Sequence, residues 1–237
     1  MKEWFAKLAA DFQQTFIDAD RWKVLLQGIG VTLKITFFAL ILGLVIGVVV
    51  AVIRSSHDQL VMDGKKSGII NFLNKICNLY LTIVRGTPVM VQLMIMYFVI
   101  MASTTNKVLV GTLTFGINSG AYVAEIIRSG IMSIDKGQME AGRSLGLSYV
   151  QTMGNIIIPQ AIKNILPALG NEFIALLKET SIVNIVGIKD ITKWAMNVQG
   201  RTYQAFMPFI GIAVIYLIMV VGISKLISIL ERKLRNG

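Results

Sequence analysis

Four stretches of this sequence run for 17 to 23 residues without a charged side chain: residues 35–53, 86–106, 108–124 and 202–224. A helix of about 20 apolar residues crosses the roughly 30 Å hydrocarbon core of a bilayer. A chain inside lipid must satisfy its backbone hydrogen bonds internally, so only helices and closed barrels can span it. Helix-length runs of this kind predict an all-α membrane protein.

A fifth apolar stretch, residues 164–188, is interrupted by Glu172, Lys178 and Glu179. On insertion scales each charge at mid-helix costs about 2.5–3.5 kcal/mol, whereas an apolar residue gains roughly 0.3–0.6 kcal/mol. This stretch can span only if its charged face contacts protein or water instead of lipid. Hydropathy thus predicts four secure spans and one conditional span.

Composition supports a membrane protein without catalytic chemistry of its own. Of the 237 residues, 54% are hydrophobic and 15% charged, against about 45–50% and 25% in soluble domains. The single cysteine, Cys77, and the single histidine, His57, preclude an intrachain disulfide and a Cys/His metal cluster. No GxxxxGK[ST] phosphate loop is present. We therefore predict no catalytic residues, no metal ligands and no bound cofactor.

The net charge of +10 points to membrane lipid and not to nucleic acid, because the basic residues flank apolar runs. With five spans, ten Lys and Arg residues fall on one side and eight on the other. This small bias favours a cytoplasmic C-terminus and an N-terminus outside the cell membrane. Residues 1–24 form an amphipathic segment, which predicts either an interfacial helix or a cap packed on the bundle.

Polar residues line one face of the span at 108–127. They recur at helical spacing as Thr114, Asn118, Tyr122, Glu125 and Ser129. The stripe is either a set of interhelical hydrogen bonds or the lining of a path for a hydrophilic solute. Glu172 and Glu179, seven residues apart, share a second face. They are either neutralised by basic groups on neighbouring helices or contact a zwitterionic or cationic solute.

Two further patterns concern the backbone of the spans. Gly43 with Gly47, and Gly116 with Gly120, are GxxxG pairs that predict close helix contact. The segment Arg85-Gly86-Thr87-Pro88 combines a helix-breaking proline with a flexible glycine. It is either a hinge or the start of the second span, and we favour the start.

The loop at 135–159 predicts two short capped helices between spans. Asp135 followed by Gln138 fits an N-cap with a capping-box partner, and Gly146 is a usual residue after a helix end. Ser148 with Gln151 caps a second helix that would run to Pro159. The small side chains in the first helix suit docking into a groove of a partner protein.

This loop resembles the E-A-A-x3-G-x9-I-x-L-P pattern of the membrane subunits of ATP-binding-cassette (ABC) importers. The matching positions are Glu140, Ala141, Gly142, Gly146, Ile156, Ile158 and Pro159, with Gly142 in place of Ala and Ile158 in place of Leu. The segments RGTPVMVQL, NSGAYVAEIIRSGI and PQAIKNILPALGNEFIALLKETS look like those of polar amino acid uptake permeases. The resemblance covers roughly residues 25–232.

The resemblance implies a type I importer permease with five spans at about 28–53, 79–104, 108–127, 160–186 and 204–229. A cytoplasmic coupling helix at about 136–146, with Glu140, Ala141, Gly142, Leu145 and Gly146, would seat in an ABC ATPase dimer that uses the ATP. The implied partners are a second permease copy or a paralogue, and an extracytoplasmic amino acid binding protein.

For the translocation path, the candidate residues are Asn118, Tyr122, Glu125, Glu172 and Glu179. The paired glutamates favour basic amino acids as substrates. Two alternatives from other classes remain open: a scaffold or channel subunit whose loop docks another partner, and a membrane enzyme that uses Glu172 and Glu179.

Overall fold

The computed structural model describes residues 1–62 and 64–235, and these residues form helices and connecting turns with no strand. The α-helices are α1 (Lys2–Phe12), α2 (Arg21–Met62), α3 (Gly68–Gly86), α4 (Val89–Ile95), α5 (Lys107–Met132), α6 (Lys136–Ser144), α7 (Tyr149–Thr152), α8 (Ile158–Glu179), α9 (Ile191–Thr202) and α10 (Phe206–Arg235). Shorter π and 3-10 turns are η1 (Gln13–Ile17), η2 (Asp18–Asp20), η3 (Met96–Ile100), η4 (Met153–Ile157) and η5 (Thr180–Val186).

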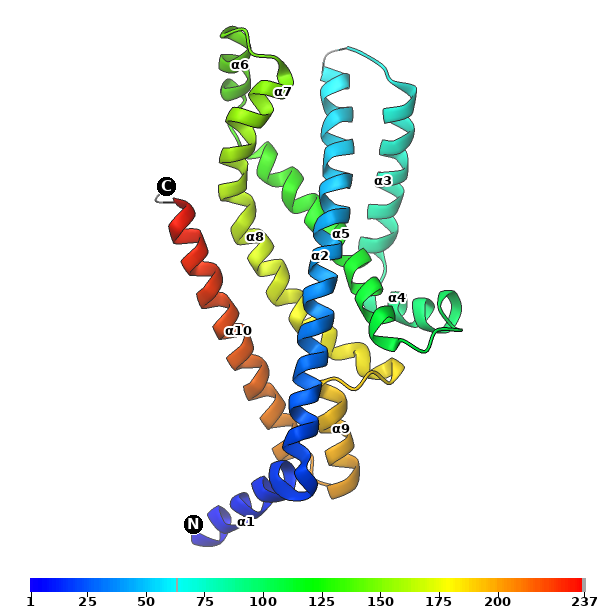
Figure 1. The fold of residues 1–237 in the computed structure, drawn as a ribbon, viewed down its shortest axis with the longest axis vertical. Coiled ribbons are helices and arrows are strands. Elements are labelled where there is room, and N and C mark those ends of the chain that lie inside the picture. Colours follow the sequence, from blue (N-terminus) through cyan, green and yellow to red (C-terminus); the bar gives the residue numbers. More distant parts are fainter. Residues whose placement is uncertain (63, 236–237) are drawn as a thin grey trace.

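The long helices run alternately up and down one elongated bundle (Figure 1). Helix α2, with 42 residues, extends along most of its length. The α6–α7 hairpin and the connection from α2 to α3 lie at one end, whereas α1 and α9 lie at the other. The chain thus separates two sets of loops at opposite ends of an apolar bundle.

Within the described residues, two helical stretches, Lys2–Met62 and Phe206–Lys233, are each long and apolar enough to cross a membrane, and α3 with α4–η3 makes a third if that bent pair is one span. Helices α5 and α8 fall short of this test. In α5 the polar Thr114, Asn118 and Ser119 are buried against protein. Burial of polar groups inside the bundle removes the cost of exposing them to lipid. In the charged fifth stretch, Glu172 is partly buried, whereas Lys178 and Glu179 are exposed on the surface of the single chain.

The apolar run at 86–106 is not one straight span. Its helix covers only Val89–Ile100 and lies at 106° to α3. Pro88 has an extended backbone with ψ of 134°, and it lacks the N–H that would continue the helix. The Gln92 side-chain amide donates hydrogen bonds to the carbonyl oxygens of Val84 (2.8 Å) and Thr87 (3.1 Å). The break leaves these two oxygens without a helical partner. The prediction that RGTP merely starts the span was wrong, since it divides two helices.

The two GxxxG pairs meet in one contact between α2 and α5. The sequence predicted close helix contact at each pair but not that the pairs face each other. A Cβ on Gly47 would lie 2.4 Å from Val123 Cγ1, and one on Gly116 would lie 2.6 Å from Leu42 Cδ2. Neither position has room for a side chain, so the backbones approach closely. Ile35 of α2 and Phe115 of α5 are fully buried, and both belong to one hydrophobic core cluster.

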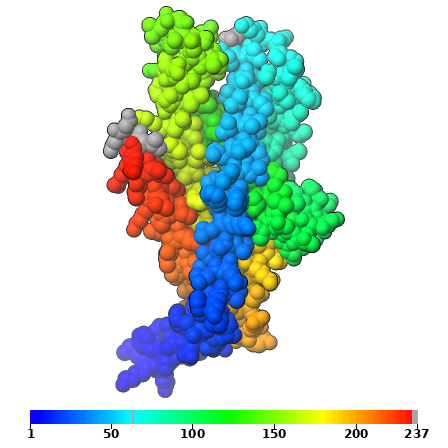
Figure 2. Space-filling view, viewed as in Figure 1, coloured from blue at the N-terminus to red at the C-terminus, as the bar shows by residue number. Residues whose placement is uncertain are grey.

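The N-terminal segment packs on the bundle only in its later turns. Helix α1 has no buried residue, and it extends away from the bundle with Trp4 and Phe5 exposed (Figure 2). Farther along, the Phe16 ring stacks on Trp194 of α9 at 5.5 Å between ring centroids. The packed alternative is therefore confirmed for the turns around Phe16, whereas the interfacial helix stays a prediction for α1.

Helix α9 is anchored by its buried N-cap, Asp190. The Asp190 carboxylate accepts hydrogen bonds from the backbone N–H groups of Lys193 (2.8 Å) and Thr192 (3.1 Å). Burial raises the pKa of this carboxyl above its usual range, and the two backbone hydrogen bonds partly oppose that rise. The cap fixes where α9 starts at the end of the bundle opposite α6.

Candidate functional site

Helix α6 is capped by hydrogen bonds at both ends. The Asp135 carboxylate accepts from the Gly137 N–H at 2.7 Å, and Gln138 lies beside Gln160 instead of closing the predicted capping box. After the helix, the N–H of Leu147 donates to the Gly142 carbonyl (3.1 Å) around Gly146 with φ of +84°. This is a Schellman C-cap, for which glycine is the usual residue.

The second helix of the hairpin begins as predicted but does not end at Pro159. Ser148 and Gln151 form a reciprocal capping box. The helix then passes through the π turn η4 into α8 and ends at Glu179. Pro159 directly follows the π turn η4, so its missing N–H falls where the regular α-helical hydrogen bonding is already interrupted. The hairpin is consequently continuous with a helix that enters the bundle.

The inner and outer faces of α6 differ. Gly142 is buried, and a Cβ there would lie 2.5 Å from the Thr152 Cγ2 of α7. Glu140 and Ala141 are exposed, and Leu145 is 81% exposed. Gly142, which departs from the Ala of the importer pattern, thus makes room for Thr152. The exposed face combines a carboxylate, a small residue and an unpacked leucine, as a docking surface would.

A polar cavity of about 440 Å³ lies between the end of α3, α5 and α8. Part of the predicted stripe lines it: Tyr122, Glu125 and Ser129, together with Arg85 and Glu172. Its other lining residues are Ile126, Gly130, Ser133, Asn164 and Ala168. The stripe therefore divides along the helix, with its C-terminal half at the cavity.

The other half of the stripe serves contacts between and within helices. The Thr114 hydroxyl donates to the Val110 carbonyl of its own helix. The Asn118 amide donates to Gln92 Oε1 at 3.1 Å and so holds the residue that bridges the α3–α4 break. Glu179 ends α8 as an exposed residue outside the cavity lining.

Arginines from two other helices surround Glu125. Its Oε1 lies 2.7 Å from Arg54 Nη1 of α2 and 3.8 Å from Arg85 Nη1 of α3. The Arg85 guanidinium is also 5.7 Å from the centre of the Tyr122 ring. A second cavity of about 410 Å³ shares Arg85 and Glu125 with the first. Glu125 thus joins three helices beside two polar cavities.

Glu172 has a neutral partner. It accepts a hydrogen bond from the Ser119 hydroxyl of α5 at 2.7 Å. Among the ion pairs of the described residues, none includes Glu172 or Glu179. The predicted neutralisation by neighbouring basic groups is therefore not observed there, and Glu172 brings a carboxylate without a cationic partner to the cavity.

Four residues that contact the site were not predicted from the sequence. Arg54, Gln92 and Ser119 were not candidate residues, and Arg85 was not expected to be a partner of Glu125. The available signal was a basic residue at the end of an apolar run near the polar stripe, but spacing alone assigns it no partner. Among the described residues, no group of three or more His, Cys, Asp or Glu side chains could hold a metal ion.

The all-helical bundle, with its capped and exposed hairpin continuous with α8, matches the fold of the membrane subunits of type I importers. The model of the family described as "Binding-protein-dependent transport system inner membrane component" matches residues 68–236, and the chain belongs to this family. It is a permease that works with a substrate-binding protein and with separate subunits that carry the ATPase.

Known proteins resemble nearly the whole chain. A Rickettsia typhi protein provisionally assigned as a glutamine transport system permease is 40% identical over 213 residues, 89% of this chain and 92% of its own. An arginine transport system permease of Bacillus subtilis is 35% identical over 90% of this chain and 93% of its own. The crystal structure of an amino acid ABC transporter with histidines matches with a TM-score of 0.79 at 42% identity, covering 89% and 94%.

Proposed function

We propose that this permease imports polar amino acids along the cavity between α3, α5 and α8. Similar proteins named for glutamine and arginine transport support the substrate class. The observation that carries the path is that Arg85 and Glu172 line the same cavity. A guanidinium can bind the carboxylate of an amino acid, while an unpaired carboxylate can bind its ammonium group.

Within this proposal the candidate path residues have different roles. Tyr122, Glu125 and Glu172 line the path, whereas Asn118 positions Gln92 at the helix break beside Arg85. Glu179 lies outside the cavity, so we propose that it faces a second permease subunit. Because Glu179 lies elsewhere, Glu172 is the one carboxylate of the pair that can bind a cationic group in the cavity. A single carboxylate suits the one ammonium group of a neutral zwitterion better than a solute with an additional positive charge.

Uptake measurements with Glu172→Gln test the path. Loss of a charge-assisted hydrogen bond of about 1.5–3 kcal/mol predicts a ten- to hundredfold higher KM for uptake. Glu231→Gln on α10, outside this cavity, is the matched control and should transport normally. Wild-type KM values for glutamine, arginine and histidine in Glu172→Gln would contradict the proposed path.

We further propose that α6 is the coupling helix and that Glu140, Ala141 and Leu145 contact the ATPase, which binds the ATP. Their exposure supports this role, with Gly142 and Gly146 shaping the helix and its end. Glu140→Arg should prevent ATPase recruitment while the permease still inserts in the membrane. Normal recruitment would show that α6 docks elsewhere or not at all.

If α6 docks on a cytoplasmic ATPase, the helix directions place α1 outside the cell membrane and the end of α10 inside. A second permease, either a copy or a paralogue, would close the cavity, in which Arg85 and Tyr122 are partly exposed. Single cysteines at Lys2 and Arg232 test this topology. An impermeant maleimide on intact cells should label the first and spare the second, and the reverse pattern would invert the chain.

A further inference from the structure

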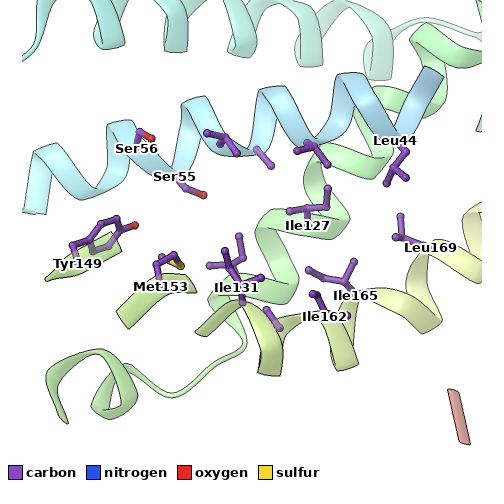
Figure 3. Close-up of a pocket in the computed structure, with 15 residues that line it drawn as sticks. Leu44, Ser55, Ser56, Ile127, Ile131, Tyr149, Met153, Ile162, Ile165 and Leu169 are labelled. Carbon is purple, nitrogen blue, oxygen red and sulfur yellow. The ribbon is translucent and has the colours of Figure 1, made fainter. Parts of the chain in front are cut away.

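An apolar groove of about 460 Å³ lies apart from the polar cavities (Figure 3). Val48 and Val52 of α2 line one wall, Ile158 and Ile162 of α8 line the other, and Ile131 of α5 contributes to its lining. Val48, Val52, Ile158 and Ile162 are each 41–59% exposed, and Ile131 is partly buried. The groove is therefore open on the outer surface of the single chain.

The depth of the groove restricts what can fill it. The apolar part of its α2 wall, from Leu44 to Val52, belongs to the uncharged run at 35–53, so it lies at the level of the hydrocarbon core. An apolar cavity does not retain water, which needs two or more polar partners. An empty groove would forfeit the dispersion contacts of every side chain along it. Hydrocarbon must therefore occupy it, from either lipid or protein.

The polar groups of the groove gather at one end. Ser55, Ser56 and Tyr149 lie near the α6–α7 hairpin, whereas Leu44 and Leu169 lie at the opposite end (Figure 3). Hydroxyl groups at the hairpin end can bond to an ester or phosphate group. The other end offers only hydrocarbon. This one-sided polarity matches a molecule with a polar head and an apolar tail.

The groove is long as well as open. Leu44 and Ser56 are 12 residues apart on α2, or about 18 Å at 1.5 Å per residue. An extended hydrocarbon chain can follow the groove along that length.

We propose that this groove binds one acyl chain of a membrane phospholipid, with its head group at Ser55 and Ser56. The bound chain packs between α2 and α8 at the base of the hairpin. It replaces the missing protein contacts along that seam and supports the helix that carries α6. The site is independent of the solute path, so the transport assignment does not rest on it.

Native mass spectrometry of the assembled transporter, purified in mild detergent, tests the site. The wild-type complex should retain one phospholipid per copy of this chain. Val48→Trp fills the groove from α2 and Ile162→Trp fills it from α8, and each should lose that lipid. The matched control is Val49→Trp, because Val49 is 53% exposed on α2 but does not line the groove. It should retain the lipid.

Each outcome decides the proposal, because the same spectrum reports whether the complex is intact. A wild-type complex without retained phospholipid would overturn it, and so would equal retention in all four proteins. A photo-crosslinking residue at Val52 separates lipid from protein. An adduct with the mass of a phospholipid supports the proposal, whereas a crosslink to another polypeptide would assign the groove to a subunit contact.

Discussion

Replacing Gly142 by alanine tests the packing between the two helices of the hairpin. The change restores the Ala of the importer pattern, so the motif alone predicts a harmless substitution. The structure predicts the opposite, because the added Cβ would lie 2.5 Å from Thr152 Cγ2 and 2.8 Å from Thr152 Oγ1. The measured stability therefore shows whether the importer pattern or the contact with Thr152 decides which residue is tolerated at position 142.

Two effects of opposite sign set the magnitude. Alanine gains about 1 kcal/mol over glycine inside a helix. The Cβ would lie about 1 Å inside the usual carbon–carbon distance of about 3.5 Å, and overpacking of this kind costs about 1–3 kcal/mol. The net change is a loss of stability of up to about 2 kcal/mol for the hairpin. In a Thr152→Ala background the nearest atom of residue 152 is Cβ, 3.2 Å away, so Gly142→Ala should then stabilise.

A double-mutant cycle measures this difference directly. The four proteins are compared by thermal unfolding of the purified permease and by affinity for the ATPase subunit. We expect a coupling free energy of about 1–3 kcal/mol between residues 142 and 152, with alanine unfavourable only beside threonine. If Gly142→Ala changed stability by the same amount in both backgrounds, to within about 0.5 kcal/mol, the contact would not explain why glycine occupies this position.

Three further predictions follow from contacts elsewhere in the bundle. Glu125→Gln leaves Arg54 without its partner at 2.7 Å and should lower thermal stability by about 1.5–3 kcal/mol together with uptake. An Arg54→Gln/Glu125→Gln protein should recover most of the stability, and no recovery would show that the pair is not the cause. Gly47→Leu should prevent accumulation of folded permease, since its Cβ would lie 2.4 Å from Val123. Gly30→Leu on the same helix, which meets no atom within 4 Å, should accumulate normally, and equal yields would refute close packing at Gly47. Asp190→Ala removes the cap of α9 and should cost about 0.5–2 kcal/mol in thermal unfolding, whereas Asp190→Asn retains an acceptor and should stay near wild type. Equal losses in the two Asp190 variants would mean that its charge, and not its capping bonds, supports α9.

Much of the candidate site followed from local patterns. The hairpin could be predicted because capping bonds join residues two to five positions apart, as at Ser148 and Gln151. The polar stripe of α5 could be predicted because helical periodicity fixes which residues share a face. Its division was not predictable: Asn118 contacts Gln92 whereas Glu125 faces the cavity, and the position of other helices decides between these roles.

The sequence by itself determined that the chain is a helical membrane protein, that long apolar runs lie in α2 and α10, and which loop carries the coupling pattern. Those features depend on the cost of charge in lipid and on hydrogen bonds within single turns. Only the tertiary structure decided the 106° break after α3 and the continuation of the hairpin helix past Pro159. It also decided the pairing of Glu125 with Arg54, 71 residues away. The physical reason is that the bend rests on Gln92, which bonds the freed backbone and is held by Asn118 of another helix, and that a charge finds its partner only through packing.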